Sequence, residues 1–172
     1  VLSHEGYRRA GGHLQDMVER FVDDYPEAME IAESLRTGIS VTGFDEAIML
    51  TQDGFVSEGS GENIFTIVDN TIYMPPVSDS NLVGITRDSA IQIAQSELGL
   101  NVIERRIRRS ELYLADEVFL TGTAAHIQGV GYLDNRIIGN GNKGPITTKI
   151  DRIYQEAIRG NNKDYLHWCT SV

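Results

Sequence analysis

Apolar residues recur at helical spacing over the N-terminal part of the chain. Large apolar side chains between Leu14 and Tyr25 lie three or four positions apart and form one stripe. Pro26 suits the first turn of a second helix, because that turn does not use its first backbone N–H groups, and Gly38 ends the pattern. We predict that residues 1–43 form an N-terminal helical segment that packs on a neighbouring surface. We find no candidate chemistry in it.

From residue 44 onward the pattern changes to short runs of β-forming residues separated by tight turns. Asp53-Gly54 and Asp69-Asn70 lie between such runs and are typical of hairpin turns, because these residues tolerate a positive φ. The predicted strands are Phe44–Leu50, Asn63–Val68, Val102–Ile107 and Glu117–Leu120. The last of these is mostly apolar, so we expect it to be buried.

Helical spacing returns at three places in the second half of the chain. Arg87–Leu98 carries an apolar stripe and is followed by Gly99, a common helix terminator. A short helix is predicted over Ser110–Ala115, and Pro145 opens a final helix. Strands mixed with helices in this order predict an α/β (α+β) fold for residues 44–172.

The net charge of the chain argues against one class of binding partner. The chain has a net charge of −10, which argues against a nucleic-acid surface, since such a surface needs a basic stripe. Four arginines between Arg105 and Arg109 alternate with apolar residues. We interpret them as a solvated strand face rather than a phosphate-binding patch.

The composition gives no sign of a metal site, a disulfide or a membrane segment. The lone Cys169 cannot form an internal disulfide, which fits a reducing compartment. The four histidines show no zinc-binding spacing. No apolar run reaches membrane length, and the first residues lack a signal-peptide pattern. We expect a cytoplasmic protein without a metal, a nucleic-acid partner or a membrane partner.

Three short segments carry residues suited to ligand binding. Ser57–Asn63 places two glycines beside Glu58, so the backbone can approach a ligand next to a carboxylate. Gly84–Asp88 enters a helix that Thr86 can cap, and the first N–H groups of a helix suit a phosphate. Thr121–Ala125 follows the buried strand, and ligands often sit at strand ends of open α/β sheets. Taken singly, each segment is also typical of a plain turn, an unliganded helix start or a tight connection.

Together and in this order, the three segments resemble the class IV aminotransferases. The likeness continues through Leu112–Phe119, Gly144-Pro145 and the closing His167-Trp168. Within the class, the chain looks most like the branched-chain amino-acid group. The resemblance covers residues 44–172 without a gap and implies the mixed-sheet, cofactor-binding C-terminal domain of these enzymes.

The resemblance implies pyridoxal 5'-phosphate as the cofactor. Glu58 corresponds to the carboxylate that pairs with the pyridine nitrogen and keeps it protonated, so that the ring can take up carbanion electrons. Ile85 and Thr86 correspond to donors to the cofactor phosphate. Leu82 corresponds to a residue that packs on the ring, and Thr123 to a further phosphate contact.

The resemblance also implies a substrate and a reaction. Thr123 and Ala124 lie where the family receives the substrate carboxylate through backbone N–H groups. The implied activity, part of branched-chain amino acid biosynthesis, is transfer of an amino group between a branched-chain amino acid and 2-oxoglutarate. The expected partners are therefore a small-molecule amino acid and a 2-oxo acid. Family members are at least dimers, which favours a homo-oligomer.

The sequence departs from the family pattern in its lysines. The family's Schiff-base lysine lies shortly before a segment that resembles Val1–His4, so this sequence does not contain it. The lysines present are Lys143, Lys149 and Lys163. None of them stands at the expected place, so we assign no catalytic residue and expect the chain on its own to be inactive. His126 also stands where the family usually has glutamate.

Two other interpretations remain open on the sequence alone. The first is a non-catalytic scaffold or binding module derived from the same domain, which the missing lysine favours. The second is another class IV activity, a D-amino-acid aminotransferase or an aminodeoxychorismate lyase. The run from Glu58 to Phe65 favours the branched-chain group over the second.

Overall fold

The computed structural model describes residues 43–169, so the apolar stripe predicted from Leu14 to Tyr25 lies outside the described residues. Ile48–Tyr154 form one compact unit, and a second unit contributes residues 43–47 and 155–169 to the described part. The main sheet and the candidate ligand-binding residues belong to the first unit. The domain boundary between residues 43 and 44 stays a prediction.

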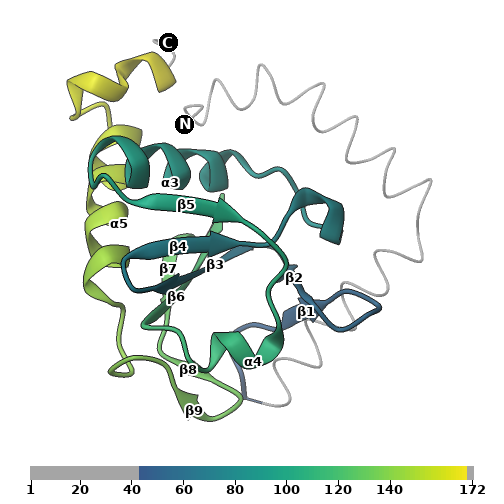
Figure 1. Ribbon diagram of the computed structural model, residues 1–172. Helices are drawn as coiled ribbons and strands as arrows, with labels where there is room; N and C mark the ends of the chain where they lie inside the picture. Colours follow the sequence, from purple (N-terminus) through teal and green to yellow (C-terminus); the bar gives the residue numbers. More distant parts are fainter. Residues whose placement is uncertain (1–42, 170–172) are drawn as a thin grey trace. The chain divides into compact units, whose positions relative to one another are not determined.

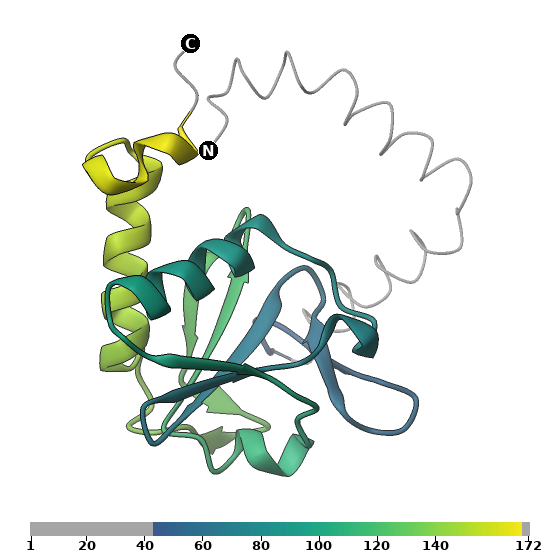
Figure 2. The same ribbon diagram turned by 45° about the horizontal axis from the view of Figure 1, so that its top comes forward.

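A five-stranded mixed sheet with the order β5-β4-β3-β6-β7 is the centre of the first unit. Its strands are β3 (Asn63–Val68), β4 (Thr71–Met74), β5 (Asn101–Glu104), β6 (Glu117–Gly122) and β7 (His126–Val130). β5 runs parallel to β4, whereas the other neighbours are antiparallel. A parallel pair needs a crossover connection, and here the helix α3 (Ile85–Ser96) provides it. Figures 1 and 2 show α3 lying across one face of the sheet. The predicted α/β fold with a mixed sheet is confirmed.

Both predicted hairpin turns are present. Asp69 and Asn70, between β3 and β4, have φ values of 47° and 59°, as the two central residues of a type I′ turn require. A separate antiparallel pair, β1 (Ile48–Leu50) and β2 (Val56–Gly59), is joined through Gly54 at a φ of 83°. The strand predicted from Phe44 begins only at Ile48, because Ile48 already pairs with the last residue of β2.

The predicted buried strand, β6, separates two layers of side chains. Successive side chains of a strand point to opposite faces. Val118 and Leu120 belong to an apolar cluster with residues such as Ile107, Leu112 and Ile138, which includes the end of the short helix α4 (Arg109–Leu112). Glu117, Phe119 and Thr121 face the other way, toward the helices. On that face the ring of Phe119 stacks on Phe65 with 4.7 Å between centroids.

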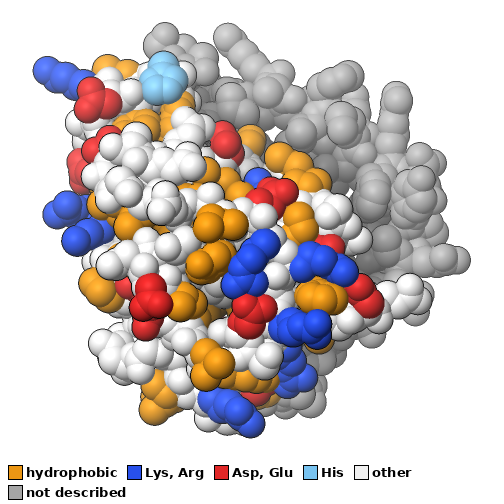
Figure 3. Space-filling view, in the orientation of Figure 1, with side chains coloured by type: hydrophobic (Ala, Val, Ile, Leu, Met, Phe, Trp, Pro, Cys, Tyr) orange, Lys and Arg blue, Asp and Glu red, His pale blue; other side chains and the backbone are white. Residues whose placement is uncertain are grey.

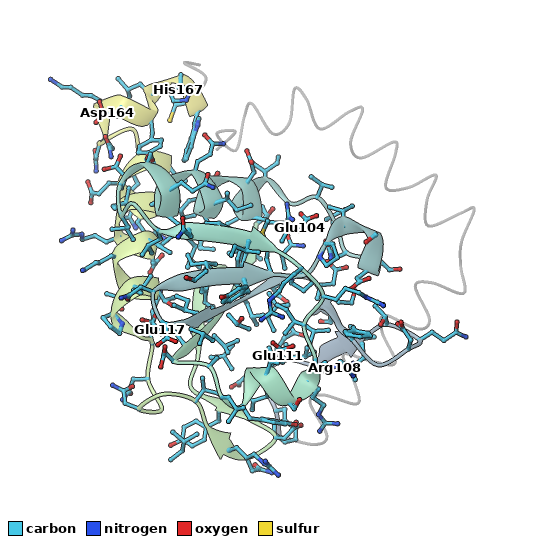
Figure 4. All side chains as sticks on the ribbon, in the orientation of Figure 1. Glu104, Arg108, Glu111, Glu117, Asp164 and His167 are labelled. Atoms are coloured by element: carbon cyan, nitrogen blue, oxygen red, sulfur yellow. The ribbon has the colours of Figure 1, made fainter. Side chains whose placement is uncertain are left out.

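The final helix, α5 (Pro145–Ile158), begins at the predicted proline and is capped by a buried carboxylate from β6. Glu117, labelled in Figure 4, accepts the backbone N–H of Ile146 at 2.9 Å through Oε1. Its Oε2 accepts the backbone N–H and the hydroxyl of Thr147 at 2.8 and 2.6 Å. A carboxylate at this end of a helix satisfies its unpaired N–H groups and interacts favourably with its dipole. Glu117 therefore ties the sheet to α5.

The remaining elements are short. They are η1 (Val77–Asp79), β8 (Tyr132–Leu133), β9 (Arg136–Ile137) and η2 (Lys163–Trp168). In the second unit, η2 begins where the Asn162 side chain accepts the N–H of Asp164 at 3.1 Å, and Tyr165 packs on Trp168 with 4.3 Å between centroids.

The arginine cluster is solvated, as expected, but it does not form a strand. β5 ends at Glu104, because the parallel ladder with β4 ends there. Arg105 donates to Glu111 at 2.7 Å, and Arg109 donates to Asp134 at 2.7 Å. Arg106 bridges Asp53 at 2.8 Å and the buried Asp79 at 3.0 Å. Figure 3 shows basic and acidic side chains interspersed on this face.

The bridge made by Arg106 controls the titration of Asp53. Hydrogen bonding from Arg106, and then from the Thr51 hydroxyl, lowers the pKa of Asp53 from 3.8 to about 2. We expect Arg106→Gln to return the pKa of Asp53 toward 3.8, measured by NMR titration of the carboxylate.

The same change should alter the pH dependence of stability. A lowered pKa in the folded state stabilises the fold above the unfolded value and loses that effect as the pH falls through the folded value. For Asp53 this window runs from pH 3.8 down to about 2, so the variant should show a weaker dependence there. Arg105→Gln is the control, because Arg105 pairs with Glu111 instead. An unchanged pKa of Asp53 in Arg106→Gln would contradict the assignment.

Candidate functional site

The three predicted ligand-binding segments meet at one pocket of about 300 Å³. The pocket lies at the edge of the sheet where β3 begins, β6 ends and α3 starts. Its lining residues are Glu58, Ser60, Gly61, Glu62, Asn63, Leu82, Gly84, Ile85, Thr86, Thr121, Gly122 and Thr123. Five of the six residues predicted to bind a cofactor or substrate are in this lining, and Ala124 is not. Ala124 lies in the turn between β6 and β7.

The N-terminus of α3 contributes backbone donors to the pocket. Gly84 is the N-cap, in an extended conformation and without a side-chain capping hydrogen bond. Asp88 donates to the carbonyl of Gly84 at 3.0 Å, so the N–H groups of Ile85 to Arg87 precede the first helical hydrogen bond. A helix start of this kind favours an anion.

The predicted capping role of Thr86 is wrong. α3 begins at Ile85, two residues before the predicted Arg87, so Thr86 lies within the first turn rather than before it. Its hydroxyl lies 3.5 Å from the hydroxyl of Tyr154 on α5. Apolar spacing located the body of this helix, but the extended backbone of Gly84 sets its start.

Glu58 is held at the pocket by two donors. Its Oε2 accepts the backbone N–H of Leu82 at 2.9 Å and the side-chain amide of Asn63 at 3.2 Å. The same amide nitrogen of Asn63 donates to the carbonyl of Leu82 at 2.7 Å. The Leu82 side chain is 72% exposed and forms an apolar part of the pocket wall. Glu58 is therefore not a free surface glutamate in a glycine turn.

Two buried polar residues of the pocket were not predicted from the sequence. Asn63 and Thr121 are partners across the β3–β6 ladder and are 7% and 1% exposed. Among the described residues, the Thr121 hydroxyl has no hydrogen-bond partner. An unmatched buried hydroxyl costs free energy, and this one belongs to a residue of the pocket lining. The sequence signal was the run from Thr121 to Ala125, but Thr121 and Gly122 belong to β6 and only the rest forms a turn.

At two glycines of the pocket the backbone lies very close to a neighbouring side chain. A Cβ at Gly84 would lie 2.4 Å from Oδ1 of Asn63, and one at Gly122 would lie 3.0 Å from the Glu62 side chain. Any larger residue at Gly84 would therefore have to displace Asn63. The tight packing fixes the wall between Glu58 and the start of α3.

The arrangement suits a ligand that carries both a positively charged group and an anionic group. Glu58 offers a carboxylate to the pocket, and the helix start with Thr86 and Thr123 offers hydrogen-bond donors to an anion. Within the part of the chain that the structure describes, the lining contains no lysine, arginine, histidine or cysteine. Among residues 43–169 no group of histidine, cysteine or acidic side chains could hold a metal ion. No described helix has the length and apolar character that a membrane crossing needs.

Comparison with known proteins shows the family of the chain. Residues 35–131 match the family model for amino-transferase class IV. A probable branched-chain-amino-acid aminotransferase of Aquifex aeolicus (strain VF5) is 49% identical over 80% of this chain and 44% of its own length. The branched-chain-amino-acid aminotransferase of Pseudomonas aeruginosa is 45% identical over 76% of this chain and 42% of its own length.

Solved structures give the same result. The branched-chain aminotransferase from the archaeon Thermoproteus uzoniensis, solved with norvaline, has a TM-score of 0.76 and 42% identity, over 81% of this chain and 46% of that one. The holo-form enzyme from Thermobaculum terrenum has a TM-score of 0.75 and 37% identity, over 78% and 44% of the two chains. The chain thus spans less than half the length of the relatives that it matches. The family match and these identities show that the chain belongs to the class IV aminotransferases.

Proposed function

We propose that this chain is the cofactor-binding part of a pyridoxal-phosphate-dependent enzyme that transfers an amino group between a branched-chain amino acid and 2-oxoglutarate. The observation that carries the proposal is the convergence of Glu58, the start of α3 and Thr123 on one pocket. The names of the relatives favour the branched-chain substrates over the other class IV activities. We further propose a cytoplasmic location and small-molecule partners, an amino acid and a 2-oxo acid.

The pocket residues fit the chemistry of the cofactor. The uncapped start of α3 and the hydroxyls of Thr86 and Thr123 suit a phosphate. Glu58 supplies the anion that a protonated pyridine nitrogen needs, and Leu82 offers an apolar surface for the ring. When bound, the cofactor supplies a ring that takes up the electrons released from the substrate.

In this proposal the binding residues have separate roles. Glu58 would hold the proton on the ring nitrogen, because its carboxylate would stabilise the positive charge there. Ile85 and Thr86 would bind the phosphate. The backbone N–H groups of Thr123 and Ala124 receive the substrate carboxylate in this proposal. Ala124 lies in the turn next to the lining residue Thr123.

Absorbance titration with pyridoxal 5'-phosphate tests the proposal. We expect the purified chain to bind the cofactor weakly and reversibly, with a spectrum different from that of the free compound. Glu58→Gln should weaken binding roughly tenfold or more and shift the spectrum, because the pyridinium loses a charged hydrogen-bond partner. Glu62→Gln makes the same charge change at the same pocket and should have a much smaller effect.

Treatment with borohydride gives an independent check. Since no lysine lines the pocket, we expect the mass of the reduced and dialysed protein to be unchanged. An adduct on Lys143, Lys149 or Lys163 would contradict reversible binding. A wild-type spectrum identical to that of the free cofactor, or equal affinities for wild type and Glu58→Gln, would overturn the proposed site.

A further inference from the structure

We propose that Asn63 is a positioning residue that sets the distance between the two ends of the cofactor site. One end is the Glu58 carboxylate, and the other is the N-terminus of α3. The inference rests on the proposed function and extends it to a residue that would not contact the reacting atoms.

The first support is a closed ring of hydrogen bonds. The Asn63 amide nitrogen donates to Oε2 of Glu58 at 3.2 Å and to the carbonyl of Leu82 at 2.7 Å. The N–H of Leu82 closes the ring by donating to the same Oε2 at 2.9 Å. A side-chain amide nitrogen has two N–H donors, so both are used here. Asn63 thus joins β2, which carries Glu58, to the loop that leads into α3.

The second support is the rigidity of the residue that makes this link. Asn63 is the first residue of β3 and pairs with Thr121 on β6, so its backbone is held by the sheet. Its side chain is buried, and Gly84 comes so close that a Cβ there would lie 2.4 Å from Oδ1. Gly84 is the N-cap of α3. Asn63 therefore links Glu58 to Leu82 and lies close to Gly84, from a position that the sheet holds.

This arrangement explains why the residue is asparagine. Aspartate has the same shape but no donor, and its charge would face the Glu58 carboxylate and the Leu82 carbonyl. Leucine has a similar volume and no polar atom. Glutamine keeps the donors but adds a methylene to a buried side chain, which shifts the donors from their acceptors.

A positioning role makes a prediction that a merely structural role does not. The pyridoxal ring is rigid and in the proposed site would contact both Glu58 and, through its phosphate, the start of α3, so an error in their separation should weaken binding of the whole cofactor. Inorganic phosphate would contact the start of α3 and Thr123 but not Glu58, so its affinity should be insensitive to that separation. Loss of Asn63 should therefore weaken pyridoxal 5'-phosphate much more than inorganic phosphate.

The experiment compares wild type, Asn63→Leu and Asn63→Asp in the full chain. Absorbance titration gives the affinity for pyridoxal 5'-phosphate, and NMR shifts of the α3 amides give the affinity for inorganic phosphate. In Asn63→Leu we expect roughly tenfold or more weaker cofactor binding, with phosphate affinity changed by less than about threefold. Asn63→Asp should lose at least as much cofactor affinity. In both variants the amide of Leu82 should exchange with solvent faster without any ligand.

Ser57→Ala is the matched control. The buried Ser57 hydroxyl donates to the carbonyl of Asp79 at 2.7 Å, so it also links β2 to the segment before α3, but it does not line the pocket. Its loss should leave the ratio of cofactor to phosphate affinity unchanged.

The outcomes separate the two proposals. Cofactor affinity that is unchanged in both Asn63 variants overturns the role of Asn63 and leaves the proposed function standing. Equal losses for cofactor and phosphate, or the same loss in Ser57→Ala, show a structural role only and also overturn it. If neither Asn63→Leu nor Asn63→Asp folds, Asn63 is needed for the fold as a whole, and a role confined to the cofactor site is overturned. A wild-type chain that binds no cofactor overturns the proposed function itself, and with it any role of Asn63 toward that cofactor.

Discussion

Gly144→Ala is expected to lower the free energy of unfolding by roughly 3 kcal/mol, because the new methyl group must displace a buried charged cap. A Cβ at Gly144 would lie 2.1 Å from Cδ of Glu117. Glu117 is 6% exposed, and its carboxylate accepts three hydrogen bonds from the first turn of α5. Gly144 has no positive φ, so alanine is allowed by the backbone and the effect is steric. Urea denaturation measures it.

The control is Gly61→Ala. Gly61 also lacks a positive φ, and a Cβ there would meet nothing within 4 Å, so its stability should change little. A double variant sharpens the test, since Glu117→Ala removes the atoms that the methyl group would strike. In that background Gly144→Ala should cost much less, and the two losses should not add. Additive losses would show that Glu117 is not the obstacle.

Phe119→Ala is expected to cost about 3–5 kcal/mol, as truncation of a fully buried aromatic ring does. Phe119 is 0% exposed, pairs with Phe65 across the β3–β6 ladder and stacks on its ring with an interplanar angle of 1°. The surrounding sheet and helix hold these positions from both sides, so the structure can collapse only partly into the space left. Thermal unfolding followed by circular dichroism measures the loss.

Leu114→Ala serves as the comparison for this truncation. Leu114 is 81% exposed, and a surface change of this kind usually alters stability by less than about 0.5 kcal/mol. Phe119 lies two residues before Thr121 on the same face of β6, so its loss should also weaken cofactor binding. A stable Phe119→Ala variant would mean that the aromatic pair contributes little to the sheet.

The sequence pattern correctly predicted those elements that depend on the preferences of a few neighbouring residues. The strand Asn63–Val68 has its predicted bounds, the turn at Asp69-Asn70 has the two positive φ values that its residues favour, and α5 begins at Pro145. In each case a short run of residues has a strong intrinsic preference. The strand expected up to Ile107 stops at Glu104 instead, because its length depends on a partner, β4, that the local pattern does not show.

The sequence predicted residues of the pocket but not the hydrogen bonds that connect them. The resemblance predicted Glu58, Thr86 and Thr123 as binding residues, and the structure brings them to one pocket. It did not identify Asn63 as the link between Glu58 and Leu82, since that role depends on contacts between segments distant in the chain. The cap that Glu117 makes on α5 was missed for the same reason.

The pairing of β3 with β6 affects the order in which the strands pair during folding. β4, α3, β5 and α4 all lie between these two strands in the chain. The hairpins β3–β4 and β6–β7 are local and can form early, whereas the ladder that brings Asn63 to Thr121 must close a long loop first. The pocket therefore comes into existence only with that late closure, and a cofactor present during refolding meets no site before it.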